Sequence, residues 1–341
     1  MTLPTTNIQM LLVSRPTGEP GPDNFRLVET PLPALKDGQV LVRHHWLSLD
    51  PYMRGRMSEE KSYAQPQPLG AVMIGGTAGV VATSRHPGYA EGDAVVGMGG
   101  WQAYSVVDAA TPGLLRKVDA TRVPLSAYLG AVGMPGVTAW MGLTQILTPK
   151  EGQTIAVSAA SGAVGSIVGQ LAKQRGCRVV GVAGGPEKCG WVTGTLGFDA
   201  CVDHKRHGDL ASMTAALREA APRGIDGYFD NVGGLVLDGV MAAMNDHGRI
   251  AVCGMIAGYN GAPMAMANPM LILRSRLLIQ GFIVSERMDL WPAALKELAD
   301  GVAEGRLKYR ETIAEGLAAA PEAFVGLLKG RNFGKQLVKL A

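Results

Sequence analysis

Unbroken apolar runs separated by helical patterns dominate the second half of the chain. Helical periodicity is clearest over residues 162–174, where Val164, Ile167 and Leu171 recur at intervals of three and four. Strands that are buried on both faces have unbroken apolar runs, and strands joined by helical crossovers pair in parallel. The pattern therefore predicts a doubly wound α/β domain with a six-stranded parallel sheet. The expected strands cover residues 154–158, 178–183, 200–203, 225–230, 249–254 and 277–284.

Residues 1–125 have a different pattern, in which short β-runs alternate with turn residues. Glycine-rich stretches such as 97–100 are typical turn chemistry. We expect a compact β-barrel or a distorted sheet in this region. The last residues, 335–340, have the pattern of an amphipathic strand. The expected β-runs of the first region are 40–42, 78–81, 94–96 and 104–107.

Length and charge narrow the function classes. At 341 residues the chain is long enough for two domains. The 47% of hydrophobic and 18% of charged residues are typical of globular proteins and exclude a disordered polyelectrolyte. A net charge of +3 favours neither nucleic acid nor a membrane surface as partner. No apolar run reaches membrane-spanning length, and the N-terminus lacks the basic start of a signal peptide, so we expect a cytoplasmic location.

A glycine-rich turn after the first strand of the α/β domain predicts a dinucleotide site. Strand 154–158 runs into Gly162, Ala163, Val164 and Gly165, and a helix follows. Gly162 permits a sharp turn close to a pyrophosphate, and Gly165 permits close packing of the helix. The N–H groups at the start of the helix are available to phosphate oxygens.

The end of the second strand favours NADP over NAD. NAD sites usually have an acidic residue there, which binds the ribose 2′-hydroxyl. This chain has Gly184 and Gly185 instead, which leave room for a bulky group, and Lys188 follows. A lysine ammonium suits a 2′-phosphate, although a solvated lysine at the start of a helix is the alternative interpretation of Lys188.

Metal ligands are not expected. The four cysteines, at positions 177, 189, 201 and 253, contain no closely spaced pair, so a structural zinc lobe is not predicted. Adjacent residues of a strand face opposite ways, so His44 and His45 do not form a shared ligand pair. We expect no bound metal.

Several sequence motifs are spread over nearly the whole chain. They are LSLDPYMRGRM (47–57), GMPGVTAW (133–140), AASGAVG (159–165), YFDNVGG (228–234), CGMIAGYN (253–260), GFIV (281–284) and NFGK (332–335). Together they resemble one known family, the zinc-independent medium-chain dehydrogenase/reductases of the prostaglandin reductase and curcumin reductase type. The zinc-dependent relatives have Gly-His-Glu where this sequence has IGGT at 74–77, and no cysteine precedes position 177.

The resemblance implies a fold and a reaction. The fold would be a GroES-like, β-rich catalytic domain (1–128 and 306–341) with a Rossmann NADP-binding domain (129–305). The reaction would be NADPH-dependent reduction of the C=C bond of a hydrophobic enone, with hydride added to the β-carbon and a proton to the enolate. A homodimer is implied as well. A zinc-free NADPH quinone reductase and a cofactor-binding protein without catalysis are the alternatives.

The resemblance also implies roles for single residues. Tyr52 and Tyr259 match catalytic-site tyrosines, each of which could instead only pack. Arg54 and Arg56 either orient an acidic substrate or, as we favour, fix a loop. Histidine replaces a tyrosine that is common at position 204, so NADPH affinity could depend on pH. Besides Gly162, Ala163, Val164, Gly165, Gly185 and Lys188, the implied cofactor residues are Met134, Thr138, His204, Asn231, Cys253, Phe282, Val284 and Asn332.

Overall fold

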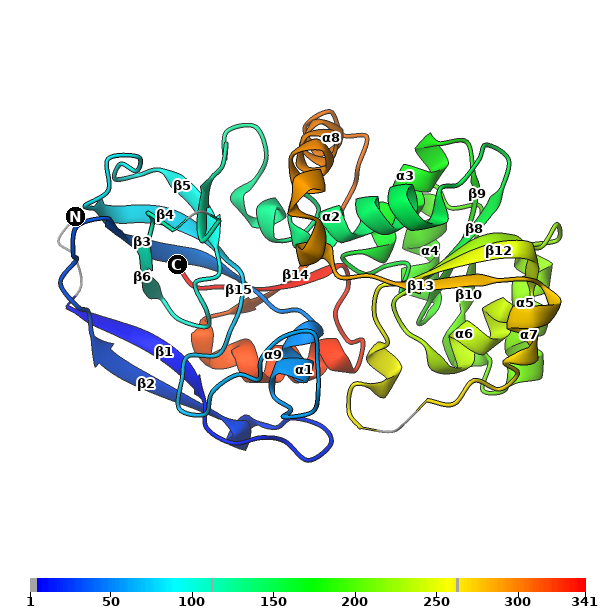
Figure 1. The fold of residues 1–341 in the computed structure, drawn as a ribbon, viewed down its shortest axis with the longest axis horizontal. Coiled ribbons are helices and arrows are strands. Elements are labelled where there is room, and N and C mark those ends of the chain that lie inside the picture. Colours follow the sequence, from blue (N-terminus) through cyan, green and yellow to red (C-terminus); the bar gives the residue numbers. More distant parts are fainter. Residues whose placement is uncertain (1–4, 112, 262–263) are drawn as a thin grey trace. The chain divides into compact units, whose positions relative to one another are not determined.

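The computed structural model describes residues 5–111, 113–261 and 264–341 (Figure 1). The chain divides into two compact units. Unit 1 contains residues 1–130 and 311–341, and unit 2 contains residues 131–310. These boundaries lie a few residues beyond the sequence-based ones. Within the described residues, no helix has both the length and the apolar character needed to span a membrane.

Unit 2 has a six-stranded sheet in the order β10-β9-β8-β11-β12-β13, and every neighbouring pair is parallel. The predicted doubly wound sheet is therefore confirmed. The fifth and sixth strands differ from their expected limits, because the fifth begins earlier and the sixth ends before residue 284. The strands are β8 (Thr154–Ser158), β9 (Arg178–Ala183), β10 (Ala200–Asp203), β11 (Ile225–Asp230), β12 (Met244–Val252) and β13 (Leu278–Gly281).

Two hydrophobic clusters cover the two faces of this sheet. Val157 of β8 and Phe229 of β11 lie in one cluster, whereas their neighbours Ala156 and Tyr228 lie in the other. Alternating side chains thus face opposite cores, as expected for a strand buried on both faces. Figure 1 shows α3 on one side of the sheet and α6 on the other. The α-helices are α2 (Met134–Met141), α3 (Gly165–Gln174), α4 (Pro186–Gly194), α5 (Leu210–Ala220), α6 (Gly234–Met241), α7 (Met270–Arg274) and α8 (Trp291–Ala303).

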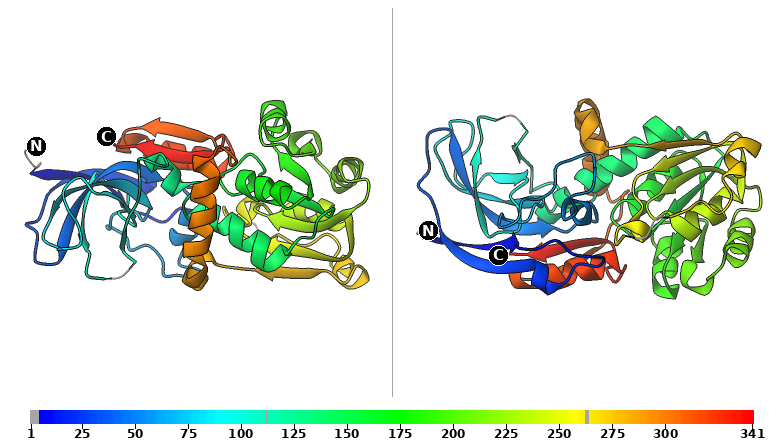
Figure 2. Two further views of the ribbon diagram at one scale, coloured as in Figure 1. Left: turned by 90° about the horizontal axis from the view of Figure 1, so that it is seen from above. Right: turned by 60° about the horizontal axis from the view of Figure 1, so that its bottom comes forward.

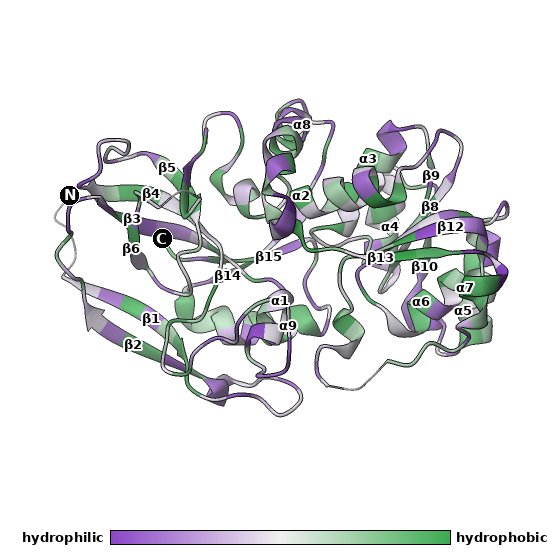
Figure 3. Cartoon of the chain, viewed as in Figure 1, coloured by the Kyte–Doolittle hydropathy of each residue, from purple (hydrophilic) through white to green (hydrophobic). Residues whose placement is uncertain are grey.

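Short helices of other types complete unit 2. A π-helix, η3, continues α2, and three 3-10 helices follow strands or loops. Helix α3 contains hydrophobic and hydrophilic residues, as Figure 3 shows, and its residues from Gly165 to Ala172 are all buried. The short helices are η3 (Gly142–Leu147), η4 (His204–Arg206), η5 (Ile256–Gly258) and η6 (Val284–Leu290).

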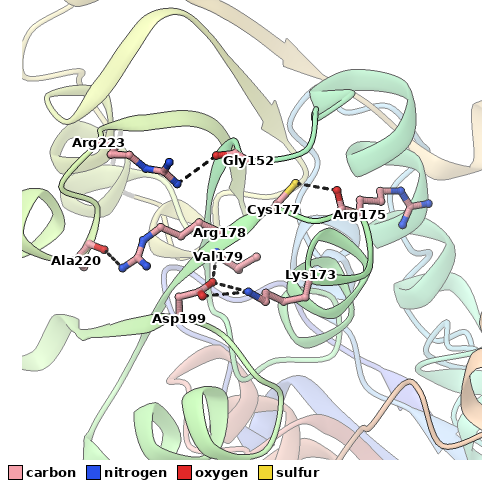
Figure 4. A network of polar contacts seen from close by, with 9 residues as sticks. All are labelled: Gly152, Lys173, Arg175, Cys177, Arg178, Val179, Asp199, Ala220 and Arg223. Atoms are coloured by element: carbon pink, nitrogen blue, oxygen red, sulfur yellow. Dashed lines mark hydrogen bonds and ion pairs between the residues drawn. The ribbon is translucent and has the colours of Figure 1, made fainter.

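Polar contacts fix the amino ends of β9 and β10 (Figure 4). Asp199 accepts hydrogen bonds from the Val179 N–H at 2.7 Å and from Lys173 Nζ at 2.9 Å. The Arg178 guanidinium donates to the carbonyl of Ala220 at 2.9 Å, so α5 is connected to the same edge. The amino edge of the sheet is therefore held by structural contacts, and the carboxyl edge is the one that binds ligands in this fold class.

Unit 1 is built on a sheet in the order β14-β15-β3-β4-β5-β7, with β6 paired to β3. The C-terminal segment forms the expected strand, which runs antiparallel to β3 and parallel to β14. Figure 2 shows the red C-terminal segment beside the blue N-terminal strands. The strands of this sheet are β3 (Gln39–Ser48), β4 (Thr77–Ser84), β5 (Ala94–Gly97), β6 (Tyr104–Asp108), β7 (Leu115–Lys117), β14 (Glu311–Glu315) and β15 (Lys335–Lys339).

An antiparallel pair and several short helices complete unit 1. The pair joins β1 to β2. The main hydrophobic core of unit 1 consists mostly of leucine and methionine and includes three aromatic rings. The Phe25 and Trp101 rings stack at 5.2 Å, and Phe324 meets Trp101 edge-on at 5.8 Å. The elements are β1 (Thr6–Leu12), β2 (Phe25–Pro31), α1 (Tyr52–Arg56), α9 (Ala320–Leu328), η1 (Pro22–Asn24), η2 (Leu125–Leu129) and η7 (Leu317–Ala319).

Candidate functional site

The turn between β8 and α3, which is predicted to bind phosphate, is tight and closely packed. Ala159 adopts φ +48°, and its carbonyl accepts the Gly162 N–H at 2.8 Å. A Cβ atom on Gly165 would lie 2.4 Å from that same carbonyl oxygen, so only glycine fits there. The helix begins at Gly165 rather than at the expected residue 162, because the preceding residues form this turn. Gly162, Ala163 and Val164 are partly exposed and so accessible to a ligand.

The end of β11 is joined to this turn through Ser158. The Asn231 side-chain amide donates to the Ser158 carbonyl at 2.8 Å, and the Asn231 backbone N–H donates to Ser158 Oγ at 2.8 Å. These strands adjoin where the sheet order reverses direction, which is the ligand-binding position of such sheets. The structure thus places Asn231 beside the glycine turn.

The buried carboxylate of Asp230 binds the backbone at the carboxyl end of β11. It is fully buried, and its Oδ1 atom accepts four hydrogen bonds of 2.7–3.1 Å. The sequence analysis did not single out this residue. An acidic residue at the end of an apolar strand is the only signal that could have indicated it. The donors are Ser158 Oγ, Tyr228 Oη and the backbone N–H groups of Val232 and Gly233.

Cys253 and Tyr259 lie just beyond β12. The Cys253 N–H donates to the Asp230 carbonyl at 2.9 Å. Burial, with the charge of Asp230 adding to it, raises the pKa of the Cys253 thiol to about 12, so the thiol is protonated. The Met255 N–H donates to the Tyr259 hydroxyl at 3.3 Å, and a Cβ on Gly254 would lie 3.0 Å from that hydroxyl. The phenol therefore lies against the carboxyl edge of the sheet.

The end of β9 brings together the expected NADP residues and one more. Gly185 adopts φ +95° and donates its N–H to Asp203 Oδ1 at 2.7 Å. A Cβ on Gly184 would lie 2.8 Å from His204 Nε2 and 3.1 Å from Lys205 Cε. The structure therefore places Lys205 beside Gly184 as well, a residue that the sequence patterns do not single out. The only indication of Lys205 in the sequence is that it lies in a run of three basic residues, 204–206.

Lys188 is on the first turn of α4, beside this group. Burial and the positive charge of Lys205 lower the pKa of Lys188, and the charge of Glu187 opposes them. Glu187 itself lies 3.8 Å from the Arg310 guanidinium. The ammonium groups of Lys188 and Lys205 thus repel each other, and a bound anion would be attracted by both of them.

Replacing Lys188 with alanine is expected to weaken NADPH binding selectively. Loss of one charged contact with a phosphate should cost about 1.5–3 kcal/mol, or about a ten- to hundredfold rise in Kd. NADH, which has no 2′-phosphate, should bind with unchanged affinity. Titration calorimetry with both nucleotides measures the difference, and Lys296→Ala, an exposed lysine of α8, is the control. Equal losses for both nucleotides would contradict the assignment.

Four further expected cofactor residues pack around α2 and β13. Thr138 Oγ1 donates to the Met134 carbonyl at 2.7 Å within α2. The Phe282 ring meets Phe229 edge-on at 6.2 Å. The Val284 carbonyl accepts the indole N–H of Trp291 at 3.1 Å. The side chains of Thr138 and Phe282 thus have structural partners, and their cofactor roles stay predictions.

In unit 1, Tyr52 begins α1 and its surroundings are crowded. Burial and the charge of Asp50 hold the pKa of the Tyr52 phenol well above its usual range, so the phenol is protonated. Arg56 lies 5.8 Å from the centre of the Tyr52 ring and 4.5 Å from that of Tyr63. Arg54 donates to the Gly18 carbonyl at 2.7 Å, as a residue that fixes a loop does.

A buried ion pair, which the sequence analysis also missed, holds the segment before Tyr52. Lys335 Nζ lies 2.8 Å from Asp50 Oδ1 and donates to the Leu49 carbonyl at 2.5 Å. Ser48 donates to the other carboxylate oxygen. The side chains of Lys335 and Asp50 are only 4% and 7% exposed. Asn332, an expected cofactor residue, donates its side-chain amide to the Gly334 carbonyl at 2.7 Å just before β15.

The described residues contain no group of three His, Cys, Asp or Glu side chains that could hold a metal ion. His44, which the sequence analysis considered, is buried and lies 2.8 Å from Ser105 Oγ. Burial, together with His45, lowers its pKa to about 3. His44 is therefore a neutral core residue.

Two family models match the chain. The N-terminal domain of oxidoreductase matches residues 8–114, and the zinc-binding dehydrogenase matches residues 163–300. NADPH-dependent curcumin reductase of Escherichia coli is 46% identical over 98% of this chain and 97% of that protein. The NADP⁺-dependent 2-alkenal reductase of Nicotiana tabacum is 41% identical over 98% of both. Among solved structures, CurA of Vibrio vulnificus in complex with NADPH has a TM-score of 0.91 and 43% identity, covering 98% of this chain and 99% of that one.

The chain belongs to the prostaglandin and curcumin reductase family of medium-chain dehydrogenase/reductases. The resemblance inferred from the motifs is thereby confirmed. One of the matching models is named for a zinc site, but the part of the chain that the structure describes has no donor cluster of that kind. Within this family, the geometry described above indicates where unit 2 can hold a nucleotide: the glycine turn, the end of β11 and the basic group beside Gly184.

Proposed function

We propose that this protein is an NADPH-dependent reductase of the C=C bond in α,β-unsaturated ketones and aldehydes. Its similarity, over 98% of the chain, to an NADPH-dependent curcumin reductase is the observation that carries the proposal. The glycine turn at β8 and the basic side chains beside Gly184 fit the pyrophosphate and the 2′-phosphate of that cofactor. We propose Gly162 to Gly165, Gly185, Lys188 and Asn231 as the residues that hold it.

When bound, NADPH would supply a hydride to the β-carbon of the enone. Negative charge then develops on the carbonyl oxygen of the substrate, and hydrogen-bond donors must stabilise it there. A protonated phenol is a suitable donor. We propose Tyr259 for this role, because its hydroxyl lies at the carboxyl edge of the sheet beside Gly254. Tyr52, whose phenol is kept protonated, is proposed to contact the substrate.

The reaction class is tested by following NADPH consumption with a panel of enones, alkenals and quinones. Turnover of enones and alkenals, with saturated products, is expected. Turnover restricted to quinones would instead identify a quinone reductase. Tight NADPH binding with no turnover of any compound would indicate a cofactor-binding protein without catalysis.

Tyr259→Phe is expected to lower kcat and to leave NADPH affinity nearly unchanged. Removal of one donor to a developing oxyanion typically costs about 3–4 kcal/mol, and a second donor beside it reduces the effect. Phenylalanine keeps the ring and removes only the hydroxyl. Steady-state kinetics and NADPH titration measure the two quantities separately. An unchanged kcat with weakened NADPH binding would make Tyr259 a binding residue only.

Tyr52→Phe is the companion variant. We expect an effect that varies from one enone to another, because this residue is proposed to contact the substrate. A collapse of kcat that is the same for every substrate would reverse the roles of the two tyrosines.

We also propose that the reaction needs no bound metal. Reduction of a C=C bond conjugated to a carbonyl needs a hydride for the β-carbon, which NADPH would supply, a proton for the α-carbon from water or a phenol, and hydrogen-bond donors at the carbonyl oxygen, so no Lewis-acidic metal is required. Prolonged treatment with a strong chelator is expected to leave activity unchanged. Activity that falls with chelation and returns with added zinc would contradict this prediction.

A homodimer and a cytoplasmic location are proposals as well. In support of the dimer, β13 is the edge strand of its sheet, and it carries Leu278, which is 45% exposed. Leu273 and Met270 on α7 are also exposed. Exposed apolar side chains at a sheet edge suit pairing with a second copy. Sedimentation analysis of the protein and of Leu278→Lys tests the dimer, and cell fractionation tests the location.

A further inference from the structure

Two basic side chains, His204 and Lys205, lie beside Gly184, and Lys188 is close enough for its charge to act on both. Lys188 comes from α4, and His204 and Lys205 come from η4, which follows β10. Because Gly184 has no side chain, His204 Nε2 and Lys205 Cε lie where its Cβ would almost touch them. The three groups therefore share one small region at the carboxyl edge of unit 2.

Asp203 fixes the backbone on both sides of this region. Its Oδ1 atom accepts the Gly185 N–H at 2.7 Å and the Lys205 N–H at 3.1 Å. One carboxylate oxygen thus ties the glycine turn of β9 to the start of η4. The side chain of Lys205 is consequently carried on a backbone that is anchored to the turn where the 2′-phosphate is expected.

The charges in this region are poorly balanced. Burial is the main cause that lowers the pKa of His204; Asp203 raises this pKa, and the charges of Lys205 and Lys188 lower it further. Burial and Lys205 lower the pKa of Lys188 as well. A dianion placed between these groups would replace their mutual repulsion with attraction.

We propose that Lys205 and His204, together with Lys188, form a basic clamp that selects the 2′-phosphate of NADPH, and that His204 takes up a proton when this phosphate binds. The inference rests on the proposed function, since its ligand is the cofactor of that reaction. Lys205 is a specificity-determining residue in this proposal. Its ammonium supplies a second point charge opposite Lys188.

Proton uptake by His204 would make NADPH affinity depend on pH in one direction. Before binding, His204 is mostly neutral near neutral pH, because its pKa lies below the ordinary value. A bound dianion favours the imidazolium and raises that pKa. Between the free and the bound pKa, binding includes a proton, so affinity falls as pH rises through this window. The other charged groups nearby are Asp203, Glu187 and Arg206.

The specificity is tested by titration calorimetry of the full chain with NADPH, NADH and 2′,5′-ADP. Lys205→Ala should weaken NADPH and 2′,5′-ADP by about ten- to a hundredfold and leave NADH unchanged. Unchanged NADH binding also shows that the variant is folded. Arg206→Ala removes the next charge of the same short helix and should have little effect. A loss at Arg206 as large as at Lys205 would overturn the role given to Lys205, and so would an equal loss for NADH.

The proton uptake is tested by repeating the NADPH titration in two buffers of different ionisation enthalpy. The wild-type protein should take up protons near neutral pH, and His204→Gln should take up fewer. The 2′-phosphate itself titrates near pH 6, so only the difference in proton uptake between the wild type and His204→Gln reports on His204. Identical uptake in both proteins would overturn the role of His204. A wild-type protein that does not prefer NADPH to NADH would refute the cofactor assignment itself, whereas an unaffected Lys205→Ala in a protein that does prefer NADPH would refute only the clamp.

Discussion

Replacing Asp230 with alanine should remove at least about 3 kcal/mol from the unfolding free energy of unit 2 and abolish NADPH binding. Four donors converge on Asp230 Oδ1 in a fully buried position. A buried donor that loses its acceptor costs about 1–3 kcal/mol, and alanine would remove the acceptor of three donors, since only Ser158 Oγ has a second one, the Phe229 carbonyl at 3.4 Å. Two of them, the Val232 and Gly233 N–H groups, belong to the turn that follows Asn231.

The variant Asp230→Asn tests whether the hydrogen-bond acceptor or the negative charge of Asp230 is the important property. Asparagine keeps the carbonyl oxygen that can accept the same bonds, and the Oδ2 position that it changes has no hydrogen-bond partner among the described residues. We therefore expect a much smaller loss than with alanine. Thermal unfolding and NADPH titration of both variants provide the comparison. If asparagine were as damaging as alanine, the negative charge rather than the four bonds would be the important property.

Lys335→Met should destabilise unit 1 by about 3–5 kcal/mol, because it leaves the Asp50 carboxylate buried without a cation. The ammonium also donates to the Leu49 carbonyl, so a second contact is lost. Both partners are nearly inaccessible to water, which therefore cannot replace the ammonium. The affected segment leads directly into Tyr52, so kcat with enones should fall as well.

The double variant Asp50→Asn, Lys335→Met is the informative control. Neutralising both partners removes the unpaired charge, so the double variant should be more stable than Lys335→Met alone. Lys339→Met changes an exposed lysine of the same strand and should shift the unfolding free energy by no more than about 0.5 kcal/mol. Denaturant unfolding of the four proteins provides the data. A double variant less stable than Lys335→Met alone would show that the pair does not act as a charge pair.

The architecture of unit 2 could be predicted because local patterns encode it. Apolar runs identify strands that are buried on both faces, and the helical patterns between them predict that these strands pair in parallel. The glycine turn could be predicted as well, since the space at Gly165 is limited by Ala159, only six positions earlier. The motifs of the family identified the reaction class for the same reason, being short segments that can be read without the fold.

The long-range polar contacts could not be predicted in this way. Lys335 and Asp50 are 285 residues apart and meet because β15 pairs with β3. The four donors to Asp230 come together through the pairing of β8 with β11 and through a tight turn. Lys205 reaches the space beside Gly184 because β10 lies next to β9.

The sequence by itself thus determined the parallel sheet of unit 2, the glycine turn after its first strand and the family, because residues close in the chain carry those signals. Only the tertiary structure decided which side chains share a buried carboxylate or a basic cluster. Such contacts depend on which strands lie next to each other and on the desolvation of charges, and neither can be inferred from a short stretch of sequence.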